Sequence, residues 1–278
     1  MTSEDHGRQA HATPILAARN LTLRYRRKSL LGRQTSEVTA LQDVSLNLSA
    51  GKTVALIGPS GSGKSSLARC LVLLEQPDSG EIWYEGKDLL KQNAQERKES
   101  LRAIQIVFQD SAAALNPGFT VEEILDEPLV VHRIARSSVE KAGGLRELLR
   151  QVELSEGILK RRPLELSGGQ RQRVAIARAL ALEPKILILD EALSALDLST
   201  QGQIANLLLE LQEKRDLAYL YITHDVSLAV LLADEFAEIA EGRIIGTGLK
   251  LNGLTGNLHG GAKRLPLGSS SSETVPVR

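Results

Sequence analysis

The strongest chemical signal in the sequence is a glycine-rich segment, Gly58-Pro59-Ser60-Gly61-Ser62-Gly63-Lys64-Ser65. This segment fits the pattern G-x-x-x-x-G-K-[ST] in full, follows the apolar run Thr53–Ile57 and opens a helical pattern. Its glycines let the backbone curl until successive N–H groups face phosphate oxygens, and the helix N-terminus adds the positive end of its dipole. Lys64 is expected to reach the β- and γ-phosphates, and the Ser65 hydroxyl to bind Mg²⁺. The segment therefore predicts nucleotide binding, although it does not say what hydrolysis drives.

Two carboxylates stand where a second apolar run ends. The residues Ile186–Leu189 are typical of a buried strand, and Asp190 and Glu191 follow at once. Ligand sites in open α/β sheets lie at the carboxyl ends of strands. We expect Asp190 to hold Mg²⁺ through a bound water, and Glu191 to orient or deprotonate the attacking water. Taken alone, such a pair could equally be a solvated strand end, but the lysine-containing segment upstream favours catalysis.

A second candidate phosphate site starts another helical pattern. The residues Leu166-Ser167-Gly168-Gly169-Gln170 precede RQRVAIARAL, which has helical spacing. A serine and two glycines at a helix N-terminus can offer backbone N–H groups to an anion. The alternative is a plain helix start capped by Ser167. In a chain that already has one phosphate site, the anion interpretation is favoured.

Composition and charge narrow the class of protein. Apolar residues make up 42% of the 278 residues and charged residues 24%, as in globular proteins with a buried core. Basic and acidic residues both total 34, so the formal net charge is zero, which argues against a broad surface for nucleic acid or anionic lipid. No apolar run approaches the length of a membrane helix, and the N-terminus lacks a secretory signal pattern. The single cysteine, Cys70, excludes an intrachain disulfide and fits a reducing cytoplasm.

Alternating strands and helices are needed to position these groups. Buried-strand patterns occupy Thr53–Ile57, Ile104–Gln109, Lys185–Asp190 and Ala218–Thr223. Helical patterns lie between them, which predicts an α/β fold with a mainly parallel sheet.

The remaining segments predict additions to this sheet. Partial period-two patterns in ILAARNLTLRY and VTALQDVSLNL predict short strands joined by an exposed loop, RRKSLLGRQTS. Helical spacing over residues 110–165 predicts an inserted helical subdomain, with a weak point at Gly143-Gly144. We expect residues 1–14 to be a disordered lead and residues 249–278 an irregular tail.

Several further residues, taken with the motifs above, make the sequence resemble the ATP-binding subunits of ABC transporters. The glycine-rich segment matches Walker A, ILILDE matches Walker B and LSGGQ is the family signature. Tyr25 stands at the position of the adenine-stacking aromatic, Gln109 at the Q-loop, Ser194-Ala195-Leu196-Asp197 at the D-loop and His224 at the switch histidine. The resemblance covers residues 15–248. It implies a P-loop NTPase (RecA-like) core with an antiparallel β subdomain and an inserted helical subdomain over about residues 110–165.

The resemblance also implies ligands and residue roles. ATP would lie between Walker A of one subunit and LSGGQ of a second, in a head-to-tail dimer. Glu191 and His224 would be catalytic, and Asp197 would serve the dimer interface. Mg²⁺ would be held by Ser65, Gln109 and Asp190. The implied nucleotide-binding set is Tyr25, Gly58, Pro59, Ser60, Gly61, Ser62, Gly63, Lys64, Ser65, Ser66, Gln109, Ser167, Gly168, Gly169 and Gln170.

Within this family, the segment FQDSAAALNPGFTVEEILDEPL resembles the branch of dipeptide, oligopeptide and nickel importers. The chain departs from that branch in two ways, because its tail lacks an H-P-Y-T stretch and Ala192 replaces the proline common after the catalytic glutamate. In both respects the chain resembles the E-type ATPases of nickel importers. Nickel or another metal chelate is therefore slightly favoured over peptides, although an ATPase subunit has no pocket for the transported substrate.

The resemblance further implies partners and a location. The partners would be a second ATPase subunit, two membrane permease subunits and an extracytoplasmic solute-binding protein, at the cytoplasmic face of the inner membrane. An ATPase of DNA repair or translation is disfavoured, because the sequence has no long coiled-coil insertion, zinc cysteines or tandem unit. The dipeptide-type Q-loop argues against an exporter. An accessory ATPase of a soluble multi-enzyme complex, as in phosphonate breakdown, stays open as the alternative.

Overall fold

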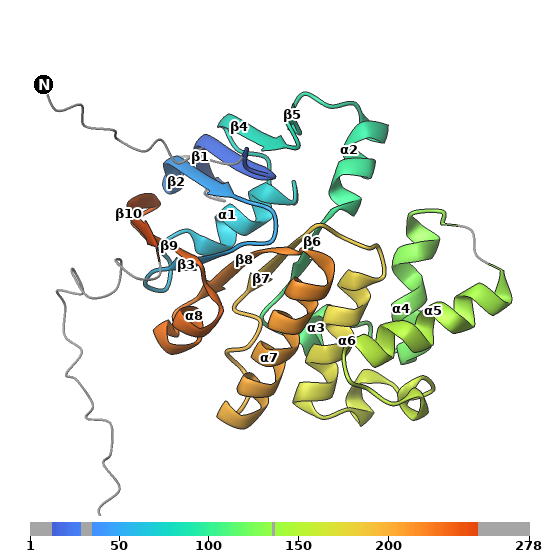
Figure 1. Cartoon of the computed structure of the whole chain (residues 1–278). Coiled ribbons are helices and arrows are strands. Elements are labelled where there is room, and N and C mark those ends of the chain that lie inside the picture. Colours follow the sequence, from blue (N-terminus) through green and yellow to red (C-terminus); the bar gives the residue numbers. More distant parts are fainter. Residues whose placement is uncertain (1–12, 29–34, 135–136, 250–278) are drawn as a thin grey trace, which may run out of the picture.

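The computed structural model describes residues 13–28, 35–134 and 137–249 (Figure 1). The predicted lead and tail therefore lie almost wholly outside the described residues. The first half contains β1 (Leu16–Lys28), β2 (Thr35–Leu48), β3 (Thr53–Ile57), α1 (Lys64–Leu71), β4 (Ser79–Tyr84), β5 (Lys87–Asp88), α2 (Ala94–Arg102), β6 (Ile104–Val107), α3 (Ser111–Ala114) and α4 (Val121–Val131). The second half contains α5 (Ser138–Gln151), α6 (Gly168–Leu180), β7 (Ile186–Asp190), α7 (Leu198–Arg215), β8 (Ala218–Thr223), α8 (Val226–Leu232), β9 (Glu235–Ala240) and β10 (Arg243–Leu249).

The larger sheet has six strands in the order β10-β9-β3-β8-β7-β6. All of its neighbouring strands are parallel except the β9–β10 hairpin. Every residue of β3, β7 and β8 is buried, because helices cover both faces of a parallel sheet and apolar side chains must fill both. Parallel pairing brings the carboxyl ends of these strands to one edge, with Ile57 opposite Thr223 and Asp190 opposite Ile222. The α/β class predicted from the sequence is confirmed.

The smaller sheet is antiparallel, in the order β2-β1-β4-β5, as predicted. The strands β1 and β2 are longer than predicted, because backbone pairing continues to Lys28 opposite Thr35 in the segment expected to be an exposed loop. A two-stranded edge ribbon tolerates polar side chains, since its strength lies in backbone hydrogen bonds and cross-strand pairs. One such pair joins Arg26 to Glu37, with 3.7 Å between Nε and Oε2.

Helices α3 to α6 lie between β6 and β7 along the chain, where helical spacing was predicted. Helix α5 runs without a break through Gly143-Gly144, so the predicted weak point is wrong. A capping box at Ser137 and Glu140 fixes the start of α5, and the buried Leu145 and Leu149 anchor it beyond the glycines. This packing compensates for the low helix propensity of glycine. No described helix combines the length and apolarity needed to cross a membrane.

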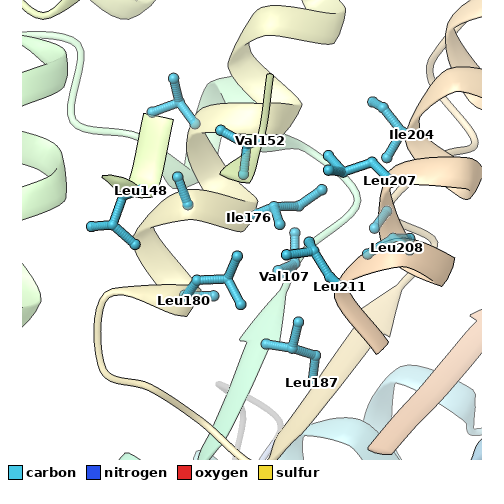
Figure 2. Close-up of a cluster of buried hydrophobic side chains, with 14 of the residues drawn as sticks. Val107, Leu148, Val152, Ile176, Leu180, Leu187, Ile204, Leu207, Leu208 and Leu211 are labelled. Carbon is cyan, nitrogen blue, oxygen red and sulfur yellow. The ribbon is translucent and has the colours of Figure 1, made fainter. Parts of the chain in front are cut away.

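One apolar core joins the helices to the larger sheet. Figure 2 shows part of this cluster, in which Leu148 of α5 and Val152, the residue after α5, lie beside α6. Apolar residues of α7 and the sheet residues Val107 and Leu187 belong to the same cluster. A second core lies between the two sheets and α1 and includes Leu21, Leu67 and Leu220. The carboxyl edge of the larger sheet is therefore held between packed layers.

Replacing Leu149 tests how much this core stabilises the protein. Leu149 on α5 is fully buried, so Leu149→Ala should lower the free energy of unfolding by about 2–5 kcal/mol through lost burial and a residual cavity. Val139→Ala is the matched control, because Val139 lies on the same helix and is 83% exposed. Urea denaturation followed by circular dichroism measures both. Equal midpoints for the two variants would contradict the assignment of Leu149 to the core.

Candidate functional site

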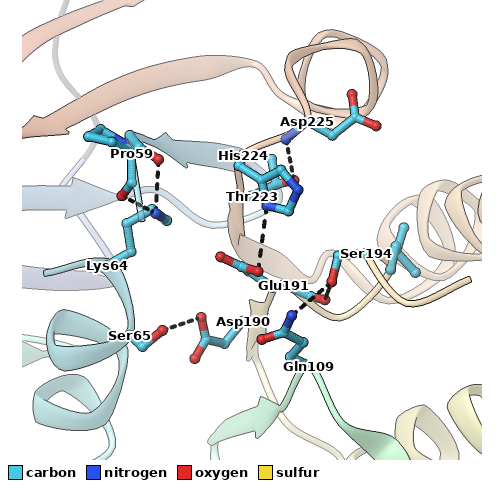
Figure 3. A network of polar contacts seen from close by, with 12 residues as sticks. Pro59, Lys64, Ser65, Gln109, Asp190, Glu191, Ser194, Thr223, His224 and Asp225 are labelled. Carbon is cyan, nitrogen blue, oxygen red and sulfur yellow. Dashed lines mark hydrogen bonds and ion pairs between the residues drawn. The ribbon is translucent and has the colours of Figure 1, made fainter. Parts of the chain in front are cut away.

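The glycine-rich segment forms the loop between β3 and α1, where a buried strand delivers it to the edge of the sheet. Lys64 is the first residue of α1 and only 5% exposed, and its ammonium donates to the carbonyl oxygens of Gly58 and Pro59 at 2.9 and 2.8 Å (Figure 3). No described side chain caps α1, so the N–H groups of its first turn are free of side-chain acceptors. A buried cation and an uncapped helix N-terminus give this loop the chemistry of a phosphate site.

Glycine is required at the start of α1 for a steric reason. Gly63 is the N-cap residue and has φ 107°, in the left-handed region that side chains disfavour. A Cβ atom at Gly63 would lie 2.4 Å from the carbonyl oxygen of Ala40, which is backbone on β2. In the same loop Ser62 is 4% exposed, and its carbonyl accepts from the Gly242 N–H at 2.9 Å. The loop is therefore fixed against β2 and the β9–β10 turn before any ligand binds, while Ser60 and Gly61 stay exposed.

Two residues of the predicted magnesium set are brought together from opposite sides of the site. The Ser65 hydroxyl on α1 donates to Asp190 Oδ1 at the end of β7, with 3.0 Å between the oxygens. Burial raises the pKa of the Asp190 carboxyl, the Ser65 hydrogen bond opposes this shift, and the Glu191 charge adds to it. A desolvated carboxylate beside a hydroxyl suits a hard divalent cation.

The fit to magnesium depends on ligands from outside the chain. Among the described residues, no group of three His, Cys, Asp or Glu side chains is arranged to hold a metal ion. Mg²⁺ usually keeps several waters and binds one or two protein ligands together with substrate phosphates. The pair of Ser65 and Asp190 meets that requirement. Bound there, Mg²⁺ would neutralise phosphate charge.

The predicted catalytic pair meets at the same edge. Glu191 follows β7 and His224 follows β8, and the distance between Glu191 Oε2 and His224 Nδ1 is 3.5 Å. The glutamate side chain is 19% exposed and the histidine 62% exposed, so the carboxylate is sheltered beneath a more open imidazole. The hydroxyl of Thr223 accepts from the Asp225 N–H at 2.9 Å and fixes the turn that carries His224. A sheltered carboxylate beside an imidazole can polarise a water.

The predicted Q-loop residue contacts this group indirectly. Gln109 follows β6 and donates through Nε2 to the Ser194 hydroxyl at 3.3 Å, and that hydroxyl donates to the Glu191 carbonyl at 2.9 Å (Figure 3). Gln109 forms no hydrogen bond to Ser65 or Asp190 in the described part of the chain. Its predicted role as a magnesium ligand stays a prediction.

The LSGGQ segment starts α6 and forms a capping box. The Ser167 hydroxyl accepts from the Gln170 N–H at 3.2 Å, and Gln170 Oε1 accepts from the Ser167 N–H at 3.0 Å. Ser167 and Gln170, two of the four nucleotide-binding residues predicted in this segment, therefore serve as helix caps. Within the described ranges, no hydrogen bond joins them to Lys64 or Asp190. A Cβ atom at Gly169 would lie 2.7 Å from Cγ2 of Thr200, so close packing against α7 requires glycine there.

Tyr25 lies on β1 beside the phosphate loop. Its hydroxyl lies 3.2 Å from the Ser66 hydroxyl and also donates to the Glu75 carboxylate. Burial raises the pKa of the Tyr25 hydroxyl, and the Glu75 hydrogen bond raises it further. The ring is therefore held at the edge of the site by α1 and the residues that follow it.

Ser194 and Glu75 are the contributors that motif analysis missed. The sequence motifs place Ser194 only in the D-loop and give Glu75 no role. Each contacts a site residue far away along the chain, so no local spacing could have identified the contact.

Comparison with known proteins gives matches of three kinds. The family model described as "ABC transporter" matches residues 41–194. The nickel import ATP-binding protein NikE of Escherichia coli (strain K12) is 48% identical over 207 residues, which cover 74% of this chain and 77% of the relative. The dipeptide transport ATP-binding protein DppF of the same strain is 41% identical over 237 residues, which cover 85% of this chain and 71% of the relative.

Solved structures of similar fold include the cassette MJ0796. Its dimeric structure, described as a bacterial ABC transporter cassette, has a TM-score of 0.75 and 33% identity, and the match covers 84% of this chain and 98% of that one. A dimeric post-hydrolysis state of the same cassette, bound to ADP and Pi, has a TM-score of 0.74 and 32% identity. These matches agree with the predicted P-loop NTPase fold.

Proposed function

The chain belongs to the ABC transporter ATP-binding subunits, in the branch of the dipeptide and nickel importers. We propose that it powers import of nickel or another metal chelate, or of di- or oligopeptides. The family predicted from the sequence is thereby confirmed, as is ATP hydrolysis coupled to transport. The main support for the proposal is that the predicted phosphate, magnesium and catalytic residues lie at one edge of the larger sheet. These residues are Lys64, Ser65, Asp190, Glu191 and His224.

The geometry supports a separate role for each of these residues in ATP hydrolysis. Lys64 would exchange its contacts with the Gly58 and Pro59 carbonyls for the β- and γ-phosphates. Ser65 and Asp190 would hold Mg²⁺, which supplies positive charge at the phosphates. Glu191 would orient the attacking water or take its proton, and His224 would help to hold that water.

Dimerisation would complete the site. The LSGGQ segment makes no hydrogen bond to the phosphate loop of its own chain within the described residues, and its helix N-terminus suits an anion. We infer that Ser167 and Gly169 contact the γ-phosphate held by a second ATPase subunit, and that Gly168 and Gln170 belong to the same nucleotide-binding segment. The dimeric structures of the cassette MJ0796 support this arrangement by similarity.

The remaining partners follow from the importer role. Two permease subunits and an extracytoplasmic solute-binding protein would complete the transporter, and the ATPase would work at the cytoplasmic face of the membrane. The relatives reported above are importer subunits, so the accessory ATPase of a soluble complex is not favoured.

The transported substrate can be tested with the assembled importer. The chain is reconstituted in proteoliposomes with its permeases and binding protein, and ATP hydrolysis is measured with a Ni²⁺ chelate or with dipeptides. Stimulation by the chelate alone is the expected result, because the nickel importer relative has the higher identity, 48% against 41%. Glu191→Gln in the same assembly controls for contaminating ATPases. Stimulation by dipeptides alone would overturn the nickel preference but not the importer role.

A further inference from the structure

Glu191 has an unusual backbone conformation for a residue with a side chain. Its φ is 49°, in the left-handed region, although it directly follows the regular strand β7. Residues other than glycine populate this region sparsely and keep it only where surrounding contacts enforce it. The direction in which the Glu191 carboxylate leaves the strand therefore depends on the contacts that fix its backbone.

Ser194 supplies two of those contacts. The Glu191 N–H donates to the Ile222 carbonyl on β8 at 2.9 Å, which ties one side of the residue to the sheet. The Glu191 carbonyl accepts from the Ser194 N–H at 3.1 Å and from the Ser194 hydroxyl at 2.9 Å. Because both of these bonds come from Ser194, that residue closes the turn after β7 (Figure 3).

The Ser194 hydroxyl also faces Gln109. A carbonyl oxygen can only accept, so the hydroxyl proton points at Glu191 and a hydroxyl lone pair is left for the Gln109 amide. Gln109 Nε2 donates to that lone pair at 3.3 Å. A directional chain of hydrogen bonds therefore runs from Gln109, two residues past β6, to Glu191, the residue after β7, through one hydroxyl group. Linked hydrogen bonds of this kind polarise one another.

We propose that Ser194 is a positioning residue, which holds the Glu191 backbone in its left-handed conformation and makes the direction of the carboxylate depend on Gln109. Gln109 lies two residues before the start of α3, so a shift of the segment from α3 to α6 would reach Glu191 through this hydroxyl. The proposal rests on the proposed role of Glu191 in hydrolysis. It assigns to Ser194 no contact with ATP.

Ser194→Ala removes the hydroxyl but keeps the Ser194 N–H bond to Glu191. In the full-length protein, kcat for ATP should fall roughly three- to tenfold, the effect of one lost hydrogen bond, while KM for ATP changes less than about twofold. Ser194→Thr keeps a hydroxyl and should restore kcat to within about twofold of the wild type. Ser155→Ala is the matched control, because Ser155 is exposed and its side chain caps no helix. A wild-type kcat in Ser194→Ala would overturn the proposal.

A double-mutant cycle of Ser194→Ala and Gln109→Ala distinguishes coupling between these two residues from a general loss of structure. If Ser194 transmits the influence of Gln109, the double variant should lose less kcat than the product of the two single losses. If the loss of kcat in the double variant equals the product of the two single losses, the proposed link between Gln109 and Ser194 is overturned, even if each single variant has a low kcat. Urea midpoints within error of the wild type show that the variants fold. A wild-type protein without ATPase activity would instead refute the proposed function.

Discussion

Glu191→Gln should lower the ATP turnover number by about 10²- to 10⁴-fold while leaving ATP binding intact. The amide keeps the size of the side chain and one acceptor oxygen, so the packing of the 19% exposed group is retained. It cannot accept a proton from water, and it removes the negative charge that faces His224 at 3.5 Å. ATP would then bind without being consumed, so the variant should accumulate as a nucleotide-bound dimer.

Two measurements check this result. Phosphate release by the purified chain, or by the assembled importer, gives the turnover number, and size-exclusion chromatography with and without ATP gives the oligomeric state. Glu213→Gln is the matched control, because Glu213 is an exposed glutamate on α7. Near-normal turnover by Glu191→Gln in the assembled importer would show that another group activates the water.

Lys64→Ala should weaken ATP binding by roughly 10- to 100-fold, the contribution of a hydrogen bond to a charged group. Lys64 is 5% exposed, and its ammonium lies 2.8–2.9 Å from two carbonyl oxygens of the loop. The positive charge at the end of this side chain is therefore already directed into the loop. Alanine would leave those carbonyl oxygens at the phosphate site without the charge that offsets them. The affinity loss should fall as ionic strength rises, because salt screens the missing attraction.

Isothermal titration with a non-hydrolysed ATP analogue measures this affinity directly. Lys87→Ala is the matched control, because Lys87 lies exposed on β5, outside the site. An unchanged dissociation constant for Lys64→Ala would remove Lys64 from the phosphate site, whatever the turnover number of the variant.

Local patterns in the sequence predicted the buried sheet well. The patterns at Thr53–Ile57 and Ala218–Thr223 match β3 and β8 to the residue, because both faces of a parallel strand are buried and select apolar side chains throughout. The patterns failed where tertiary contacts outweigh local preference. Gly143-Gly144 lies inside α5 because Leu145 and Leu149 are buried, and the β1–β2 ribbon continues through polar residues because its backbones pair.

The family and the residue types at the phosphate site can be predicted from the sequence alone. A phosphate loop needs glycines, a lysine and a serine at fixed spacing within eight consecutive residues. Because this geometry is local, the order of those residues is enough to predict it. Which distant side chains contact one another depends on the tertiary structure. Asp190 reaches Ser65, Ser194 joins Gln109 to Glu191, and Glu75 holds Tyr25, because strand order and helix packing bring together positions that no sequence period relates.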